Sequence, residues 1–177
     1  MRAAVAGLLA LSLAACALPR PAAAPAVYDL GPAPRSALAP TPRLAALEIT
    51  APPWLDGPGL VYRLAYQDPL RREIYRDSRW AAAPAALLAE RLRQRAAVAD
   101  RGPGVTLRLE LEAFEQVFVT PQHSEVRLRL RAWAGEGRQG VFDLVRPAAT
   151  PDAAGAVRAL GEASEALIDQ LLVWAGS

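Results

Sequence analysis

The sequence predicts an α+β fold: a two-layer domain in which a mainly antiparallel sheet carries two helices packed on one face. Residues 106–113 and 126–132 alternate strictly between apolar and polar side chains, which is typical of strands with one buried and one solvated face. Residues 81–95 and the segment from 150 onward instead repeat apolar side chains at helical spacing. Because each of these elements has a single apolar face, we expect the faces to be buried against one another in two layers.

The first residues predict export and a lipid anchor. Met1-Arg2 precedes an apolar run, residues 3–15, which ends at Cys16. The run is shorter than the roughly 20 residues that span a bilayer, but it fits the apolar region of a signal peptide. Leu13-Ala14-Ala15-Cys16 resembles the bacterial lipobox, so we expect residues 1–15 to be removed and Cys16 to be acylated. An ordinary cleaved signal with a chance cysteine is the alternative.

Residues 16–43 predict a tether between the lipid and the domain. The segment is rich in proline and alanine, and proline fixes φ and removes backbone donors, which favours an extended, semi-rigid chain. Residues 27–31 interrupt it with an aromatic and two aliphatic side chains. We expect this cluster to lie on the folded domain as an edge strand. The domain itself is expected over residues 44–177.

The first half of that domain predicts three strands and a helix. Residues 44–50 and 60–66 are rich in strand-forming side chains, and 73–76 is a short strand. Residues 51–59 hold five prolines and glycines around Trp54, which predicts a loop that presents an aromatic side chain. Over 81–95 a helix is expected, with Pro84 in its first turn.

The second half predicts a hairpin, one more strand and the closing helix. Residues 120–123 form the turn between the two alternating strands, and Phe114, Glu115 and Phe118 break the alternation, which indicates a bulge. Residues 140–145 follow as a further strand. For the closing helix, Thr150 is expected as the cap, with proline at the first helical position and an acid in the first turn.

Composition excludes several classes of protein. The 177 residues include 20 cationic side chains, all of them arginine, and 18 acidic ones, with a formal net charge of +2. This near balance does not indicate a nucleic-acid partner. One cysteine and one histidine exclude a disulfide framework and a zinc site built from several Cys or His ligands. No phosphate-binding glycine loop is present, so we expect no catalytic residues, metal or cofactor.

Three arginines alternate along one predicted strand: Arg127, Arg129 and Arg131. Three guanidinium groups on one exposed face could bind anionic groups such as lipid phosphates. The alternative is cross-strand pairing with Glu110 and Glu112. We favour the pairing, because these acids lie on the matching face of the neighbouring strand.

Four segments together resemble a known family. They are the lipobox, Tyr28-Asp29-Leu30-Gly31, Pro53-Trp54-Leu55-Asp56 leading into Val61-Tyr62-Arg63, and Arg79-Trp80-Ala81 before a helix that begins with proline. Their order and spacing are similar to those of the ABC-type transport auxiliary lipoprotein family, whose members accompany MCE-domain transport systems, including the paraquat-inducible Pqi system. This chain departs from the family at Gly57-Pro58-Gly59-Leu60, where Arg-Pro-Gln-Ile is expected.

The resemblance implies a non-enzymatic docking or assembly subunit that helps to move lipids or hydrophobic molecules across the periplasm. Its partners would be an MCE-domain protein and the permease and ATPase of an ABC transporter, and a homo-oligomer is compatible with this role. We take Trp54, Leu55, Asp56, Tyr62 and Arg63 as candidate partner contacts. Ala17, where an inner-membrane lipoprotein often has aspartate, favours the outer membrane.

Two other classes stay open. A lipopolysaccharide-assembly type lipoprotein would also place helices against a small sheet beneath the outer membrane. An envelope hydrolase would have to use His123 with exposed carboxylates.

Overall fold

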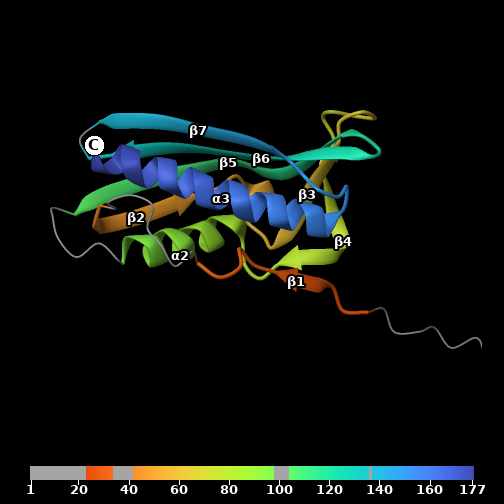
Figure 1. The fold of residues 1–177 in the computed structure, drawn as a ribbon, viewed down its shortest axis with the longest axis horizontal. Coiled ribbons are helices and arrows are strands. Elements are labelled where there is room, and N and C mark those ends of the chain that lie inside the picture. The colour runs from red at the N-terminus through yellow and green to blue at the C-terminus, as the bar shows by residue number, and fades with distance from the viewer. Residues whose placement is uncertain (1–22, 34–41, 98–103, 136) are drawn as a thin grey trace, which may run out of the picture.

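The computed structural model describes residues 23–33, 42–97, 104–135 and 137–177; Cys16 and the predicted signal peptide lie outside them. Over these residues the α+β prediction is confirmed, with two helices against a seven-stranded sheet (Figure 1). The elements, in chain order, are β1 (Ala26–Tyr28), β2 (Leu44–Thr50), the 3-10 turn η2 (Pro53–Leu55), β3 (Gly59–Leu64), β4 (Glu73–Trp80), α2 (Pro84–Ala96), β5 (Val105–Thr120), β6 (His123–Ala134), β7 (Arg138–Pro147) and α3 (Ala153–Gly176). None of the helices in these four ranges is long and apolar enough to cross a membrane.

The strand order is β1-β4-β3-β5-β6-β7. Strand β2 pairs with the first half of β5, and β3 pairs with the second half. The two longest pairings, β5 with β6 and β6 with β7, are antiparallel, as predicted. However, β2 and β3 both run parallel to β5, and β1 runs parallel to β4, so the sheet is mixed. Alternation in a sequence indicates which face of a strand is buried, but not the direction of its neighbour.

The predicted bulge lies in β5. The register with β6 shifts between Leu111, which pairs with Leu130, and Ala113, which pairs with Arg129. The extra residue is Glu112. Before it, the odd-numbered residues from Leu107 to Leu111 are buried on the inner face. After it, the even-numbered residues from Phe114 to Phe118 are buried there. The bulge therefore lets one 16-residue strand keep a continuous buried face.

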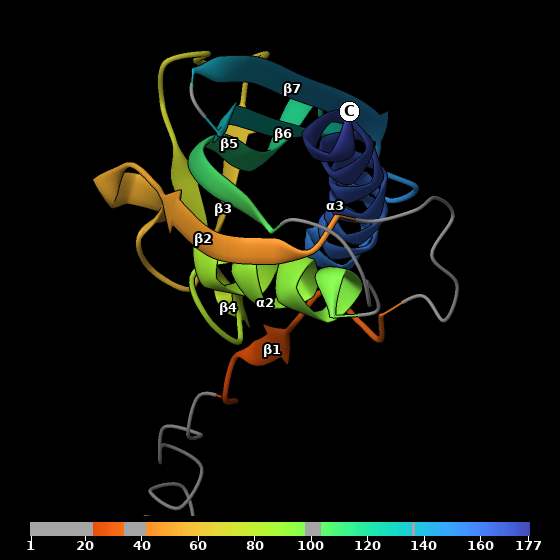
Figure 2. The same ribbon diagram turned by 90° about the vertical axis from the view of Figure 1, so that its left-hand side faces the viewer.

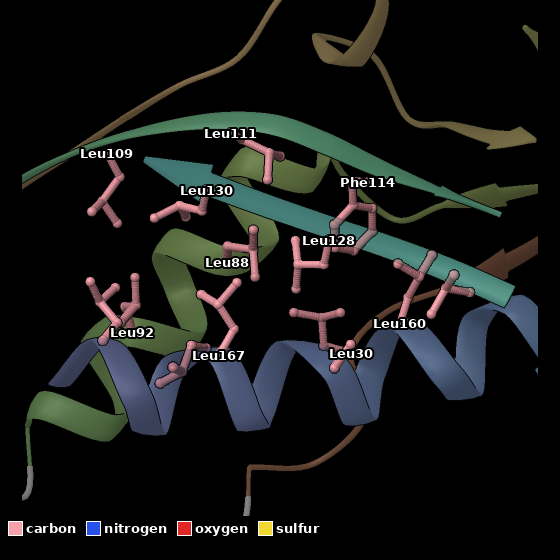
Figure 3. Packing of buried hydrophobic residues seen from close by; sticks show 14 of the residues in the cluster. Leu30, Leu88, Leu92, Leu109, Leu111, Phe114, Leu128, Leu130, Leu160 and Leu167 are labelled. Carbon is pink, nitrogen blue, oxygen red and sulfur yellow. The ribbon is translucent and has the colours of Figure 1, made fainter. Parts of the chain in front are cut away.

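The core lies between the sheet and the two helices. Figure 2 shows α3 on the concave side of the curved sheet, beneath β7 and β6, and α2 beneath β2. Figure 3 shows apolar side chains from these layers pointing toward one another. All of those it labels are buried: Leu30, Leu88, Leu92, Leu109, Leu111, Phe114, Leu128, Leu130, Leu160 and Leu167.

Both helices begin slightly later than predicted. Helix α2 begins at Pro84, because this residue fits only the first turn. The predicted cap of α3, Thr150, is wrong: the N-cap is Asp152, whose carboxylate accepts the backbone N–H of Gly155 at 2.7 Å. The Thr150 hydroxyl instead donates to Asp152 at 2.8 Å. A Cβ at Gly155 would lie 2.1 Å from the Thr150 carbonyl oxygen, so only glycine fits this close approach.

The segment from Ala26 to Pro32, which we call the strap, packs on the domain. It pairs with β4 through β1, and Leu30 is buried in the core. The folded unit thus includes residues upstream of Leu44, where the sequence predicted it to begin. This placement matches the expectation that residues 27–31 lie on the domain as an edge strand.

A buried arginine holds the strap. Arg91 of α2 is 4% exposed and donates to the carbonyl oxygens of Leu30 at 3.1 Å and Pro32 at 3.3 Å, and also to that of Gly31. The same guanidinium pairs with Glu165 of α3. One side chain therefore joins the strap to both helices.

A second buried arginine, Arg95, continues this contact one turn further along α2. It pairs with Glu165 at 3.1 Å and also with Asp169. The two helices are thus linked by two arginines and two acids, each pair spaced four residues apart on its helix.

Candidate functional site

The outer face of the sheet, turned away from both helices, carries a row of arginines from β6 held by acids from β5 and β7. Arg129 bridges Glu112 and Asp143, with 2.6 Å for each contact. Arg127 also contacts Asp143, at 3.0 Å, and Arg131 contacts Glu112, at 2.6 Å. Each carboxylate is therefore shared between two guanidinium groups.

These contacts correspond to the pairing that the sequence favoured for the arginine row, with one change of partner. Glu112 is used as expected, but Asp143 of β7 replaces Glu110; Glu110 forms no ion pair within the described ranges. The bulge explains the use of Glu112, because the extra residue lies where β5 passes Arg129.

A second cluster adjoins the row and was not foreseen from the sequence. Glu115 is buried, and both of its oxygens lie 3.2 Å from Arg63 of β3. Arg72 donates to the same carboxylate at 3.3 Å, and its guanidinium lies 3.8 Å from the ring centroid of Trp54. The Trp54 loop and the arginine row, which are far apart in the sequence, thus share one surface.

We call this surface the arginine face. It consists of Arg63, Arg72, Arg127, Arg129, Arg131, Glu112, Glu115 and Asp143, with Trp54 at its border. Five guanidinium groups share three carboxylates, so the face keeps an excess of positive charge. A groove of about 480 Å³ runs between the two clusters, lined by Arg63, Pro69, Arg72, Glu112, Ala113, Glu115, Val117, Arg127 and Arg129.

Hydrogen bonds between Asp143 and the arginines beside it favour the charged form of each group. Hydrogen bonding from Arg127, and then from Arg129, holds the pKa of Asp143 below its usual range. The hydrogen bond to Asp143 raises the pKa of Arg127, and hydrogen bonds to Glu112 and Asp143 raise that of Arg129. These three groups therefore stay charged together at the centre of the row.

The five candidate partner residues do not act as one group. Trp54 is half-buried against Arg72, Asp56 is exposed at the end of η2, and Arg63 belongs to the arginine face. Leu55 is 1% exposed in the core, so the expectation that it contacts a partner is wrong. Its side chain instead packs the Trp54 loop against the core. Tyr62 points to the opposite side of β3 from Arg63, because successive strand residues alternate.

Tyr62 has a structural setting of its own. Its hydroxyl donates to Glu73 at 2.6 Å, and its ring packs on Tyr75 and Phe118. The cluster closes one end of the core. Nothing in this arrangement presents Tyr62 on the arginine face.

The hydrolase alternative finds no assembled site in the described part of the chain. His123 is exposed in the β5–β6 turn, with Nδ1 3.2 Å from the Thr120 hydroxyl. No group of three or more His, Cys, Asp or Glu side chains that could hold a metal is found in the four described ranges.

Comparisons with known proteins agree with this description. The model of the family described as "ABC-type transport auxiliary lipoprotein component" matches residues 28–171. A crystal structure of a Xanthomonas campestris protein, described under the family DUF330, is 18% identical with a TM-score of 0.67, covering 86% of this chain and 92% of that chain. The crystal structure of an uncharacterized protein is 13% identical with a TM-score of 0.65, covering 86% and 99%. At these identities the two structures show a shared fold alone. No curated protein matches.

Proposed function

We propose, from the premise that this chain belongs to the family of ABC-type transport auxiliary lipoprotein components, that it is the docking subunit of an MCE-type transport system. In this role it is non-enzymatic, is anchored by Cys16 to the periplasmic face of the outer membrane, and helps to move lipids or other hydrophobic molecules between the membranes. The observation that carries the docking role is the arginine face: a charged sheet surface that neither helix covers, bordered by an aromatic side chain.

The arginine face has the composition of a protein-binding surface. Arginine and tryptophan dominate the binding energy of many interfaces. The side chains of Arg72, Arg127 and Arg131 are each between 41% and 46% exposed, so they keep free donors for a partner while their acids hold them in place. A guanidinium that is already ordered loses less side-chain entropy on binding. The energy for transport would come from a partner ATPase, since the sequence has no phosphate-binding loop.

The strap limits how far the domain can move from its anchor. Because β1 and the Arg91 contacts hold the chain from Ala26 onward, residues 16–25 are the part of the chain between the proposed anchor and the domain. At roughly 3.3–3.6 Å per residue, these ten residues span at most about 36 Å. The domain would therefore stay close to the membrane, and the partner would have to supply the reach across the periplasm.

The test is affinity purification of the tagged protein from crosslinked envelopes. We expect an MCE-domain protein and ABC transporter subunits to be recovered with it. The double variant Trp54→Ala, Arg72→Ala should recover much less of them. Arg76→Ala is the matched control, because Arg76 is exposed on β4 and contacts only its neighbour Asp77. Recovery of an outer-membrane β-barrel in place of any MCE or ABC component would overturn the proposal.

A further inference from the structure

One edge of the sheet is long and open. Strand β7 pairs with β6 along its whole length, from Arg138 opposite Ala134 to Pro147 opposite Glu125. On its other side no strand of the described ranges pairs with it. At the opposite end of the sheet the last strand is β1, which has only three residues and continues into the strap, so it offers no comparable length of open edge.

The backbone groups that point to this open edge can be identified. The N–H of Ala148 donates to Ser124 at 2.9 Å, one step beyond the last pair of the ladder. Hydrogen-bonded and non-bonded positions alternate in an antiparallel pair, so the even-numbered residues of β7 bond to β6. The odd-numbered residues Gln139, Val141, Asp143 and Val145 therefore direct their N–H and C=O groups outward.

The edge carries charged side chains, Arg138, Asp143 and Arg146, but it has none of the backbone features that block strand addition. Natural edges are blunted by lysine, proline, bulges or short length, yet β7 has ten residues, a regular register and its only proline at the last position. Val141 and Val145 are 54% and 51% exposed on the outer face. On the inner face Phe142 and Leu144 pack on the core but are only partly buried. An added strand would cover both sets of side chains.

The charge along the edge favours an acidic partner segment. Arg138 and Arg146 lie at the two ends of β7, and neither has a carboxylate partner in the part of the chain that the structure describes. Arg127 lies beside the edge on the neighbouring strand. The single acid of β7, Asp143, is already shared by Arg127 and Arg129.

Pairing of β7 with a second copy of itself is disfavoured by the same charges. The two antiparallel registers that join outward-pointing residues with the longest overlap place either Arg138 opposite Arg146 or Asp143 opposite Asp143. Like charges directly opposite each other destabilise a sheet. The occupant that fits is thus a different segment, in which apolar side chains alternate with Asp or Glu.

We propose that β7 binds an extended, acidic and apolar segment of a partner protein by adding it to the sheet as an eighth strand. Main-chain hydrogen bonds to the four outward amides would supply affinity, and the two end arginines would select acidic segments. The inference rests on the docking role above for the existence of a partner, but its test does not depend on that partner.

The test is amide hydrogen exchange followed by NMR on the full mature chain carrying Cys16→Ser. In the chain alone, the amides of Gln139, Val141, Asp143 and Val145 should exchange fast, and those of the even-numbered residues between them slowly, at low and high protein concentration. An end-blocked peptide of four Val-Glu repeats should slow the four outward amides by about ten-fold or more, because a bonded amide exchanges only on opening. A peptide of four Val-Lys repeats should have no such effect.

Variants make the test specific. Val141→Lys with Val145→Lys should abolish the slowing, whereas Ile74→Lys, at an exposed apolar position of β4, should preserve it. If the outward amides are already protected in the chain alone, a second copy or another segment covers the edge and the inference is overturned. It is equally overturned if a saturating concentration of the Val-Glu peptide leaves the four amides unchanged. Loss of the MCE component in the crosslinking experiment, with this protection intact, would instead refute only the proposed function.

Discussion

Removing the Arg91 guanidinium should release the strap and destabilise the domain. Arg91→Ala takes away the donors for the carbonyl oxygens of Leu30, Gly31 and Pro32 and one partner of Glu165. Leu30 is buried, so the variant leaves its carbonyl group without the hydrogen bond that offsets this burial, whereas Gly31 and Pro32 are exposed and their carbonyl groups can bind water instead.

The magnitude follows from the burial of the pair. Removing one member of a buried ion pair costs about 3–5 kcal/mol. Glu165 is 21% exposed and keeps Arg95 at 3.1 Å, so we expect the lower end, about 3 kcal/mol in the free energy of unfolding. For a domain of this size, one kcal/mol shifts Tm by roughly 2–4 °C. The midpoint should therefore fall by about 9 °C.

Urea and thermal unfolding followed by circular dichroism measure the loss, and amide exchange of the strap locates it. Arg93→Ala is the matched control: Arg93 lies on the same helix, is 59% exposed, and among the described residues forms an ion pair only with Glu90, at 3.9 Å. Its stability should change by less than about 0.5 kcal/mol. Arg91→Lys should lie between the two, because an ammonium cannot reach several carbonyl groups at once.

Two results would refute this reasoning. Equal losses for Arg91→Ala and Arg93→Ala would mean that the buried arginine contributes no more than a surface one. A large loss with unchanged exchange in the strap would mean that Arg91 stabilises only the contact between the helices.

Three further predictions concern single side chains. The Gly155 N–H hydrogen bond holds the pKa of Asp152 below its usual range, so the stability that this carboxylate contributes is complete above about pH 4 and is lost as the pH falls through the lowered pKa. In urea unfolding at pH 6 and pH 3, Asp152→Asn should therefore lose less stability on acidification than the parent protein does. An identical pH dependence of the two proteins would contradict this prediction. Glu115→Gln should lower the free energy of unfolding by about 3 kcal/mol, because it removes the charge of a buried carboxylate that pairs with two guanidinium groups. The control is Glu125→Gln, at a half-buried acid with no ion pair in the described residues, which should change the free energy of unfolding by less than about 0.5 kcal/mol. Equal losses for the two variants would argue against a stabilising Glu115 cluster. Burial raises the pKa of Tyr75 to about 12, so a spectrophotometric titration of Tyr75→Phe should lack the phenolate that forms last in the parent protein, and an unchanged final step would assign it elsewhere.

The sequence predicts local elements well where a single periodicity holds. The strand at residues 44–50 has the predicted bounds, and the hairpin of β5 and β6 lies where the alternation indicates. The prediction for β5 ends at residue 113, although the strand continues to Thr120. Glu112 is the reason: an inserted residue reverses the parity of the buried positions, so a period-2 pattern stops at the bulge even though the strand does not.

The arginine face could be predicted only in part. The row on β6 and its pairing with Glu112 follow from alternation, because both strands belong to one hairpin. The Glu115 cluster depends on β3 running parallel to β5, which brings Arg63 to a residue 52 positions away. A hydrophobic pattern carries no information about which strands become neighbours, so the contacts of Arg72 with Glu115 and Trp54 could not be foreseen.

The buried arginines of α2 show a further limit, with a consequence for function. Arg91 and Arg95 follow Leu88 and Leu92 by three residues each, so they flank the apolar stripe of α2, where a charged side chain alone does not indicate burial. They are buried because the acids of α3 repeat the same four-residue spacing and face them, a match visible only when the two helices are compared.

The contacts of Arg91 with α3 and with the strap also determine where the chain enters the domain. Arg91 fixes the strap on the helix side, and Figures 1 and 2 show β1 beyond α2, at the opposite side of the molecule from β7. The strap, which follows the proposed anchor in the chain, and the arginine face therefore lie on opposite sides of the core. A short tether attached at the helix side would turn the arginine face and the edge of β7 away from the membrane, which supports a role in receiving a partner that approaches from the periplasm.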